Sequence, residues 1–392
     1  DDVTAIFSEL DTNWQKIAVT RADGTSQLYV EKEQWDATNN QGVLWVSKSD
    51  FTISSSQTTT LFLYYDSTQS NNNEYVGGEG SGQEKRPEVW DGSYIAVYHM
   101  NQDPGVTEEL IDSTANDNNS SEIGSSLGTP DLVAGKVGNS LEFDSGTNDF
   151  ITIPDSIIDG ETSYTVETWI EADATGVDKY FLTYNQSSDA GMRYDSVGSN
   201  SGNTNLFKFQ HTDGSNAAHF ESESSIQTTN YQHVQGSWST TNGYAGYADA
   251  TSLSAGSTLN DANSLEATDL RIAGGNGISS GDPWDGEIDE MRFSSIERDA
   301  TWAKANYYAQ DDNLLSFRDI EEYGGSTSSE SGGGGNYFGD GSDGTGNFTS
   351  NTSFSNTADG DYVVKQYDGL TIDSGVTVTT ANRAKGLMIL VD

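Results

Sequence analysis

The chain of 392 residues contains no cysteine, only 5 prolines and only 18 lysines and arginines against 61 acidic residues. Without cysteine the protein has neither disulfides nor thiolate metal sites. With a formal net charge of −43, nucleic acid is not expected as a partner, because its phosphates would meet like charge. No run of about 18 apolar residues occurs, so no membrane-spanning segment is predicted.

The acidic residues belong to a folded chain rather than to a disordered one. The sequence contains 8 Trp, 19 Tyr and 14 Phe, and disordered acidic segments lack such core-forming residues. A compact protein of this charge repels itself in dilute buffer, whereas screening lengths fall to about 3 Å near 1 M salt. The composition therefore predicts a protein that works at very high salt, as in halophiles. The alternative is an acidic surface adapted to calcium.

The polar residues indicate many short strands joined by turns. Glycine is abundant, at 42 residues, and Ser, Thr, Asn and Asp dominate the other polar positions, which is typical of turn chemistry in an all-β protein. The length predicts two or three domains. Asn-x-Ser/Thr sequons support an exported location only weakly, because a chain so rich in these residues acquires some by chance; they lie at Asn118, Asn119, Asn185, Asn347 and Asn351.

Residues 1–76 are predicted to form a small β-domain, followed by a linker at 77–88. The expected strands are 14–20, 27–33, 42–47 and 59–65. Residues 61–65, Leu-Phe-Leu-Tyr-Tyr, are apolar on both faces and predict a central, buried strand. Residues 67–85 are rich in Asn, Gly, Glu and Ser and predict an exposed loop or linker.

This first segment resembles a small β-domain of unknown function that is common in prokaryotic surface proteins. The resemblance is carried by Arg21-Ala-Asp-Gly-Thr, Leu28-Tyr-Val-Glu, Trp35-Asp, Leu44-Trp-Val and the strand that ends at Tyr65. That family usually closes the last strand with Tyr-Tyr-Gly-Asn, whereas here Asp66 and Ser67 follow. The resemblance implies architecture and location, and no chemistry.

Residues 89–323 carry the landmarks of a second domain. They include Val89-Trp-Asp-Gly-Ser-Tyr, the alternating strand Tyr164–Ile170, Gly286-Glu-Ile-Asp-Glu-Met-Arg-Phe, and a closing helix at 299–308. In this order they resemble the laminin-G-like, concanavalin A-like jelly-roll. The fold class expected is all-β: a concanavalin A-like jelly-roll β-sandwich with a small N-terminal β-domain and a C-terminal β-rich segment.

The remaining residues divide into a Gly/Ser linker at 324–336 and a β-rich segment at 337–392. The segment resembles the opening of β-rich modules in virion and surface fibres of prokaryotic viruses. It ends with the apolar run Leu387–Val391. A strand at the terminus lacks a following partner, so the natural chain is expected to continue or to pair with another subunit.

The acidic run Glu287-Ile-Asp289-Glu290 is the sharpest enzymatic candidate. Laminarinase-type glycoside hydrolases share the sandwich and place three alternating carboxylates on one strand. Here the alternation fails, because Met291 and Phe293 share the parity of Asp289 while Ile288 lies on the other. A β-bulge near Asp289 and Glu290 fits better than a catalytic ladder, and no enzymatic activity is predicted.

A calcium site is implied by the jelly-roll resemblance at Asp112, Asn116 and Asp289. In that family a calcium ion often sits at the sheet edge, between an early Asp/Asn loop and the last acidic motif. Oxygen ligands of this kind suit a hard cation. The alternative is that Asp112 and Asn116 only shape an Asx turn.

The histidines and aromatic residues give no firm ligand site. His99 and His233 lie in apolar strand patterns and are expected to be hydrogen-bonded core residues, whereas His211 and His219 could approach each other in a hairpin. Trp169 and Trp238 are expected in the core. The candidates for sugar-binding platforms are aromatic residues in or near polar loops: Tyr180, Tyr184, Tyr194, Phe207 and Trp284. None of them is assigned to a sugar site.

The function expected is that of a non-enzymatic fibre, spike or capsid decoration protein of a halophilic archaeal virus. The jelly-roll would adhere to glycans or glycoproteins of the host surface, and the protein would contact other virion proteins and form a homo-oligomer. Two alternatives stay open. One is a haloarchaeal cell-surface or secreted carbohydrate-binding protein, and the other is a set of accessory domains of a polysaccharide-active enzyme.

Overall fold

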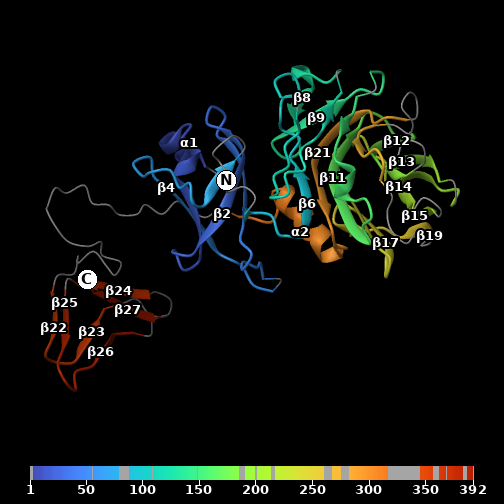
Figure 1. The fold of residues 1–392 in the computed structure, drawn as a ribbon. Helices are drawn as coiled ribbons and strands as arrows, with labels where there is room; N and C mark the ends of the chain where they lie inside the picture. Colours follow the sequence, from blue (N-terminus) through green and yellow to red (C-terminus); the bar gives the residue numbers. More distant parts are fainter. Residues whose placement is uncertain are drawn as a thin grey trace. The chain divides into compact units, whose positions relative to one another are not determined.

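The computed structural model describes residues 3–54, 56–78, 88–107, 109–124, 126–147, 149–184, 190–198, 201–212, 217–259, 267–274, 282–316, 345–355, 362–367, 369–382 and 386–391. The chain forms two compact units, Asp1–Phe317 and Arg318–Asp392. Both are built almost wholly from β-strands (Figure 1), which confirms the all-β fold class. Within these ranges, neither helix is long and apolar enough to cross a membrane.

The N-terminal β-domain is a five-stranded sheet with a helix beside it. Its sheet has the order β3-β2-β1-β4, and β5 pairs in parallel with β2. Leu10, Ile17, Leu28, Val30 and Val76 form the centre of its core. The elements are α1 (Thr4–Leu10), β1 (Ile17–Arg21), β2 (Gln27–Asp36), β3 (Gln41–Ser47), β4 (Leu61–Tyr65) and β5 (Val76–Gly78).

Two expectations for this domain were wrong. Strand β4 is an edge strand rather than a central one, with Phe62 and Tyr64 38% and 43% exposed. Period-2 alternation explains this, because Leu61 and Leu63 on the other face reach the core. The loop expected from residue 67 was wrong only at its described end: residues 68–71, 73 and 74 are exposed as predicted, whereas Val76–Gly78 form the buried strand β5.

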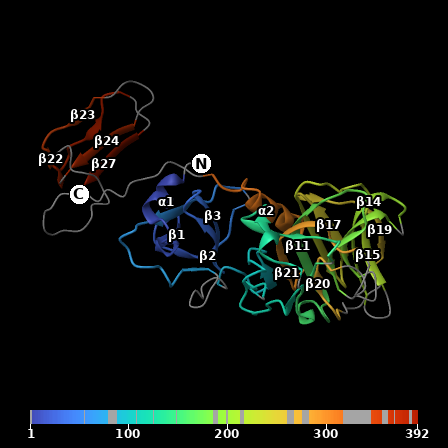
Figure 2. The same ribbon diagram turned by 90° about the horizontal axis from the view of Figure 1, so that it is seen from above.

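The jelly-roll comprises two eight-stranded sheets packed face to face (Figure 2). Sheet I has the order β18-β17-β16-β11-β21-β9-β8, with β6 also pairing with β21. Its strands are β6 (Tyr94–Tyr98), β8 (Leu132–Ala134), β9 (Asn139–Phe143), β11 (Ser163–Ala172), β16 (Gln232–Ser239), β17 (Gly243–Ala248), β18 (Thr251–Ser252) and β21 (Gly286–Ser294).

Sheet II has the order β19-β15-β14-β13-β12-β20-β10-β7. Its strands are β7 (Glu122–Ile123), β10 (Ile151–Thr152), β12 (Lys179–Thr183), β13 (Gly191–Val197), β14 (Thr204–Thr212), β15 (Ala217–Ser222), β19 (Ala255–Leu259) and β20 (Arg271–Ile272). Between the sheets lies one apolar core rich in aromatic rings. Tyr164 packs edge-on against Phe209 with ring centroids 5.6 Å apart, and Trp238 is 1% exposed, so its core assignment is confirmed.

The outer face of sheet I is covered in part by helix α2 (Ala300–Gln310). Asp299 caps this helix by accepting hydrogen bonds from the backbone of Thr301 and Trp302, at 2.9 and 3.0 Å. Trp169 of β11 donates to Gln310 at 2.8 Å and stacks on Tyr307. The predicted closing helix is therefore confirmed, and Trp169 is buried beneath it rather than between the sheets.

In the C-terminal unit, three successive strands pair in parallel with the next three strands of the chain. β22 (Thr345–Phe348) pairs with β25 (Gly369–Ile372), β23 (Thr352–Phe354) with β26 (Val378–Thr380), and β24 (Tyr362–Tyr367) with β27 (Gly386–Val391). Each strand thus meets the strand three places later, which describes two turns of a parallel β-coil. Phe348 lies between Phe354 and Tyr367 inside it, with ring centroids 5.9 and 5.8 Å away.

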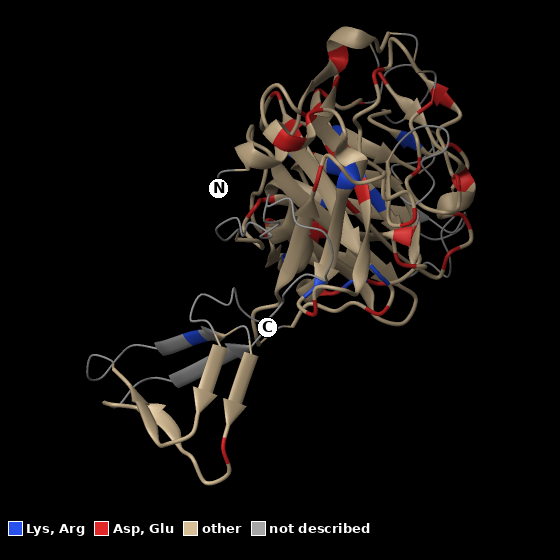
Figure 3. Cartoon of the chain, turned by 90° about the vertical axis from the view of Figure 1, so that its left-hand side faces the viewer, with Lys and Arg blue, Asp and Glu red and all other residues tan. Residues whose placement is uncertain are grey.

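Acidic residues recur along the loops and strand ends, whereas Lys and Arg residues are fewer (Figure 3). In the described part, seven of the 18 basic residues are held in ion pairs with carboxylates. They are Arg21, Lys136, Arg193, Lys208, Arg271, Arg292 and Arg298. These seven residues neutralise particular acids, and the chain as a whole keeps its large excess of acidic residues.

Candidate functional site

A β-bulge on β21 aims two consecutive acidic residues at the outer face of sheet I. Asp289 pairs with Trp169 and Arg292 with Glu167, so β21 has one residue more than β11 between these pairs. Glu290 takes the left-handed conformation, with φ of 52°. Ile288 and Met291 consequently both enter the core. The predicted bulge near Asp289 and Glu290 is confirmed.

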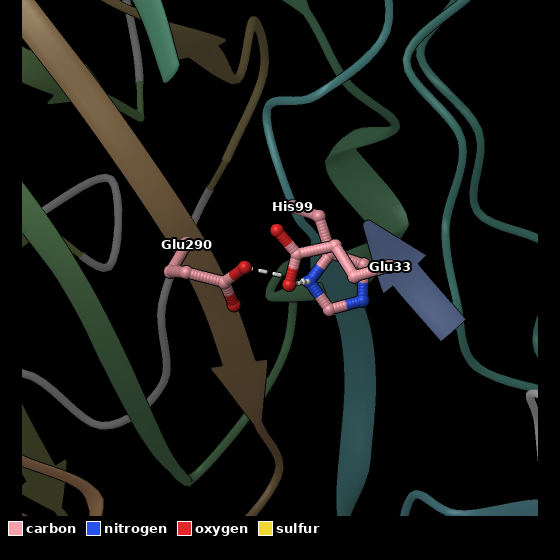
Figure 4. Close-up of side chains that lie close together, drawn as sticks. All are labelled: Glu33, His99 and Glu290. Atoms are coloured by element: carbon pink, nitrogen blue, oxygen red, sulfur yellow. Dashed lines mark hydrogen bonds and ion pairs between the residues drawn. The ribbon is translucent and has the colours of Figure 1, made fainter. Parts of the chain in front are cut away.

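Glu290 meets His99 and Glu33 in a buried cluster where the small β-domain contacts the jelly-roll (Figure 4). Glu33 lies on β2, and His99 directly follows β6. The Glu290 Oε1 atom is 2.7 Å from Nδ1 of His99, and Glu33 Oε2 is 3.4 Å from the same nitrogen. His99 is 0%, Glu290 1% and Glu33 4% exposed.

Two tryptophans and an arginine complete the cluster. The indole N–H of Trp45 donates to Glu33 at 2.7 Å, and that of Trp90 donates to Glu31 at 2.6 Å. The Arg292 guanidinium lies 4.4 Å from the Trp45 ring centroid and 5.1 Å from that of Trp90. Arg292 also pairs with Glu290 at 2.5 Å. The carboxyl groups are therefore held by donors from both domains.

Burial and mutual repulsion control protonation in this cluster. Burial, followed by the charge of Glu290, raises the pKa of Glu33 well above its usual value. Burial alone would also raise the pKa of Glu290, but His99 and Arg292 hold it below its usual range. Burial would lower the pKa of His99, yet Glu290, Glu33 and Glu31 raise it. The ion pair of His99 with Glu290 is thus the charged centre of the cluster.

Several buried atoms of the cluster have no hydrogen-bond partner. They are Glu31 Oε1, Glu33 Oε1, His99 Nε2 and Asp289 Oδ1. Buried polar atoms are almost always paired, because an unpaired one costs about 1–3 kcal/mol. Glu33 Oε1 also faces the β8–β9 turn closely, since a Cβ built on Gly138 would lie 2.5 Å from it. The cluster is therefore enclosed and incompletely satisfied.

The residues assigned to calcium fall into two separate hydrogen-bond networks. Asp112 accepts from the backbone of Val97, Thr114 and Asn118 and from the Thr114 hydroxyl, and the Asn116 amide donates to the carbonyls of Tyr94 and Ile95. Asp289 instead accepts from Val137 at 2.8 Å. Four donors on one carboxylate fit the Asx-turn alternative. The calcium assignment stays a prediction, which these bonds do not favour.

The other histidines do not form a metal pair. His219 pairs across the β14–β15 hairpin with Gln210, whereas His211 pairs with Ala218, so their side chains point to opposite faces. His211 contacts Trp238 in the core, and His219 lies 3.0 Å from the Ser257 hydroxyl. His233 is buried but has no hydrogen-bond partner on either ring nitrogen, so the expected hydrogen bond was wrong there.

The aromatic residues considered as sugar platforms, to which no site was assigned, are all buried at 1% exposure or less. They are Tyr180, Tyr184, Tyr194, Phe207 and Trp284. Four of them belong to the sandwich core. The outer face of sheet II instead carries buried ion pairs, Arg193 with Asp195 at 2.9 Å and Lys208 with Glu221 at 3.1 Å.

A hollow of about 420 Å³ lies at the β7 edge of sheet II. Its polar lining residues are Thr107, Ser121 and Glu122. Its other lining residues are Pro104, Ile123, Gly124 and Leu127. This volume lies within the range of small-ligand sites, but the hollow is open and its lining is more polar than is typical of them.

The sequons differ in accessibility. Asn347 and Asn351 are exposed, although Asn351 accepts a hydrogen bond from Thr377. Asn118 and Asn119 are half-buried, and the Asn118 amide donates to the Ile95 carbonyl at 2.9 Å. Asn185 lies outside the described residues. The C-terminal pair is thus the better exposed for modification.

The fold places this protein in the class of all-β jelly-roll sandwiches. Residues 145–304 match the family described as the concanavalin A-like lectin/glucanases superfamily, so the jelly-roll is a laminin-G-like, concanavalin A-like domain. No curated protein matches the chain.

Several solved structures are similar at low identity. Domain 4 of an extracellular arabinanase from Geobacillus stearothermophilus, in complex with arabinotriose, has 16% identity and a TM-score of 0.41, covering 54% of this chain and 97% of that domain. The receptor-binding domain of botulinum neurotoxin type G has 13% identity and a TM-score of 0.39, covering 56% of this chain and 52% of its own. Trypanosoma rangeli sialidase has 11% identity and a TM-score of 0.39, covering 57% of this chain and 34% of its own.

Sequence reasoning missed the contribution of β2 to the buried cluster. Glu31 and Glu33 alternate with Leu28 and Val30 and therefore share one face of β2, as does Trp45 on the neighbouring strand. A tryptophan on the same face as these acids was a signal that this face of the sheet is covered by another part of the protein. The partner, His99, could not be identified because the contact joins two domains.

Proposed function

We propose that this protein is a non-enzymatic glycan-binding adhesion protein whose jelly-roll recognises a carbohydrate outside the cell. The observation that carries the proposal is the match of residues 145–304 to the concanavalin A-like lectin/glucanases superfamily. A binding role rather than hydrolysis is supported by the acidic run on β21. Glu287 accepts from Ser140 at 2.7 Å, and Glu290 is buried against His99.

The hollow at the β7 edge is our candidate for the sugar site. Sugars present apolar ring faces and polar rims, and this hollow combines Ile123 and Leu127 with Thr107, Ser121 and Glu122. Its volume of about 420 Å³ suits one or two sugar rings. Monovalent binding at so small a site is weak, so we expect a homo-oligomer in which avidity compensates.

The setting we propose is high salt, on the virion of a halophilic archaeal virus, as a fibre, spike or decoration protein. Two observations support it: the formal net charge of −43 and the parallel β-coil of the C-terminal unit. Parallel coils stack by repetition and suit elongated fibres. Partners would then be host-surface glycans and other virion proteins. The same domains on a haloarchaeal cell surface are the alternative setting.

Binding to isolated haloarchaeal surface-layer glycoprotein in molar KCl tests the proposal. We expect binding by the full chain, its loss when the glycoprotein is deglycosylated, and weakening of about tenfold for Glu122→Gln, which corresponds to about 1.4 kcal/mol. Adding a chelator in a parallel assay tests the calcium prediction.

Glu223→Gln is the matched control, because Glu223 is also an exposed acid of the jelly-roll and does not line the hollow. Binding that survives deglycosylation would contradict the adhesion function. Glycan-dependent binding that is equal in both variants would place the site elsewhere on the domain.

A further inference from the structure

The cluster between the two domains has the composition of a metal site. Glu33, His99 and Glu290 each present one ligand atom, and these atoms all lie within 4.8 Å of one another. We propose that this trio binds one divalent metal ion of the zinc class and thereby clamps the small β-domain onto the jelly-roll.

The arrangement of donors favours a cation at Nδ1 of His99. Both carboxylates converge on this nitrogen, at 2.7 and 3.4 Å (Figure 4). Glu33 Oε1 is buried without a hydrogen-bond partner, so Glu33 can supply a second oxygen from the same carboxylate. One nitrogen and three oxygens make a four-coordinate set of the kind that zinc takes.

The imidazole selects against the hard cations of a saline medium. Calcium and magnesium take oxygen ligands, whereas imidazole suits zinc and its transition-metal neighbours. Glu31 Oε1 lies 3.5 Å from Nε2 of His99, and neither atom has a hydrogen-bond partner. Metal-bound histidines commonly direct the other ring nitrogen to a carboxylate in this way.

A divalent cation at Nδ1 would take the place of the proton through which His99 pairs with Glu290. Without metal, the carboxyl groups of Glu31, Glu33 and Glu290 face the His99 imidazole and the Arg292 guanidinium. With the imidazole neutral, the cation would balance the two carboxylates that coordinate it. Because Glu33 belongs to β2 and the other two ligands to the jelly-roll, metal binding would stabilise the contact between the domains.

Zinc titration of the full chain tests this proposal. The protein is stripped with a chelator and dialysed into molar KCl with excess Mg²⁺, which occupies the exposed carboxylates. Zn²⁺ is then titrated calorimetrically, and the zinc retained after gel filtration is counted by mass spectrometry. We expect one equivalent in the wild type, weakened by at least about tenfold in Glu33→Gln and in Glu290→Gln. Glu167→Gln, a buried acid of the same sheet face that is not a ligand, should retain it.

Folding of each variant is checked without metal by near-ultraviolet circular dichroism, because a buried substitution can disturb packing. Co²⁺ gives a second reading that needs no variant, since a four-coordinate site with a nitrogen ligand produces visible absorption that Zn²⁺ displaces. A folded wild type that retains no zinc overturns the proposal. So does retention that is equal in the wild type and in both ligand variants.

Discussion

His233 is a buried histidine that the fold keeps uncharged. Its ring packs edge-on against both Trp169 and Tyr307, with centroids 5.3 and 6.3 Å away, and neither nitrogen has a hydrogen-bond partner. Burial, helped by the positive charge of Arg292, lowers its pKa from 6.5 to about 3. In the unfolded chain His233 is therefore protonated below pH 6.5, whereas in the folded chain it stays neutral down to about pH 3. The stability contributed by neutral His233 is lost as the pH falls through this window.

We expect His233→Phe to remove this acid sensitivity. The phenyl ring has a similar size and no nitrogen to protonate. Below pH 6.5, the wild type should lose about 1.4 kcal/mol of its free energy of unfolding, relative to the variant, for each pH unit. Urea unfolding of both proteins in molar KCl, at about pH 7.5 and about pH 5.5, measures the difference. A difference that does not change with pH would contradict the assignment.

At the scale of elements, close packing between the sheets requires glycine on β16. A Cβ built on Gly236 would lie 2.6 Å from the Phe209 ring. Gly236→Ala should therefore lower the free energy of unfolding by about 1–3 kcal/mol through overpacking. Gly92→Ala is the control, because no atom lies within 4 Å of its Cβ position. Equal denaturation midpoints for the two variants would show that β16 and Phe209 separate easily.

Elements were predictable from sequence to the extent that their signals are local. Alternation identified β11, and the run of residues 299–308 identified α2, because both patterns depend on neighbouring residues. The parity break around Asp289 even located the bulge on β21. The edge position of β4 was not predictable, since strand order depends on distant pairings. The cluster of Glu33, His99 and Glu290 required two domains to meet, and no local pattern contains that contact.

At the scale of the molecule, the acidic excess destabilises the folded chain by repulsion, and salt screens this repulsion. The chain carries 61 acidic and 18 basic residues. Several of the basic side chains are committed to local pairs, such as Lys208 with Glu221 and Arg292 with Glu290, which are nearly inaccessible to salt. Exposed acids consequently face mainly other acids. Their repulsion reaches about 10 Å in 0.1 M salt and about 3 Å in 1 M salt.

We therefore expect the fold to loosen when KCl is lowered from molar concentration to about 0.1 M. The urea midpoint of unfolding should fall steadily over this range. The buried ion pairs should contribute little to the trend, because low-dielectric pairs are screened far less than surface charges. Substituting Lys for several exposed acids of the jelly-roll should flatten the salt dependence without changing the fold, whereas the same number of Asp-to-Glu exchanges should leave it unchanged. Stability that is independent of salt would contradict the halophilic interpretation, even if glycan binding were confirmed.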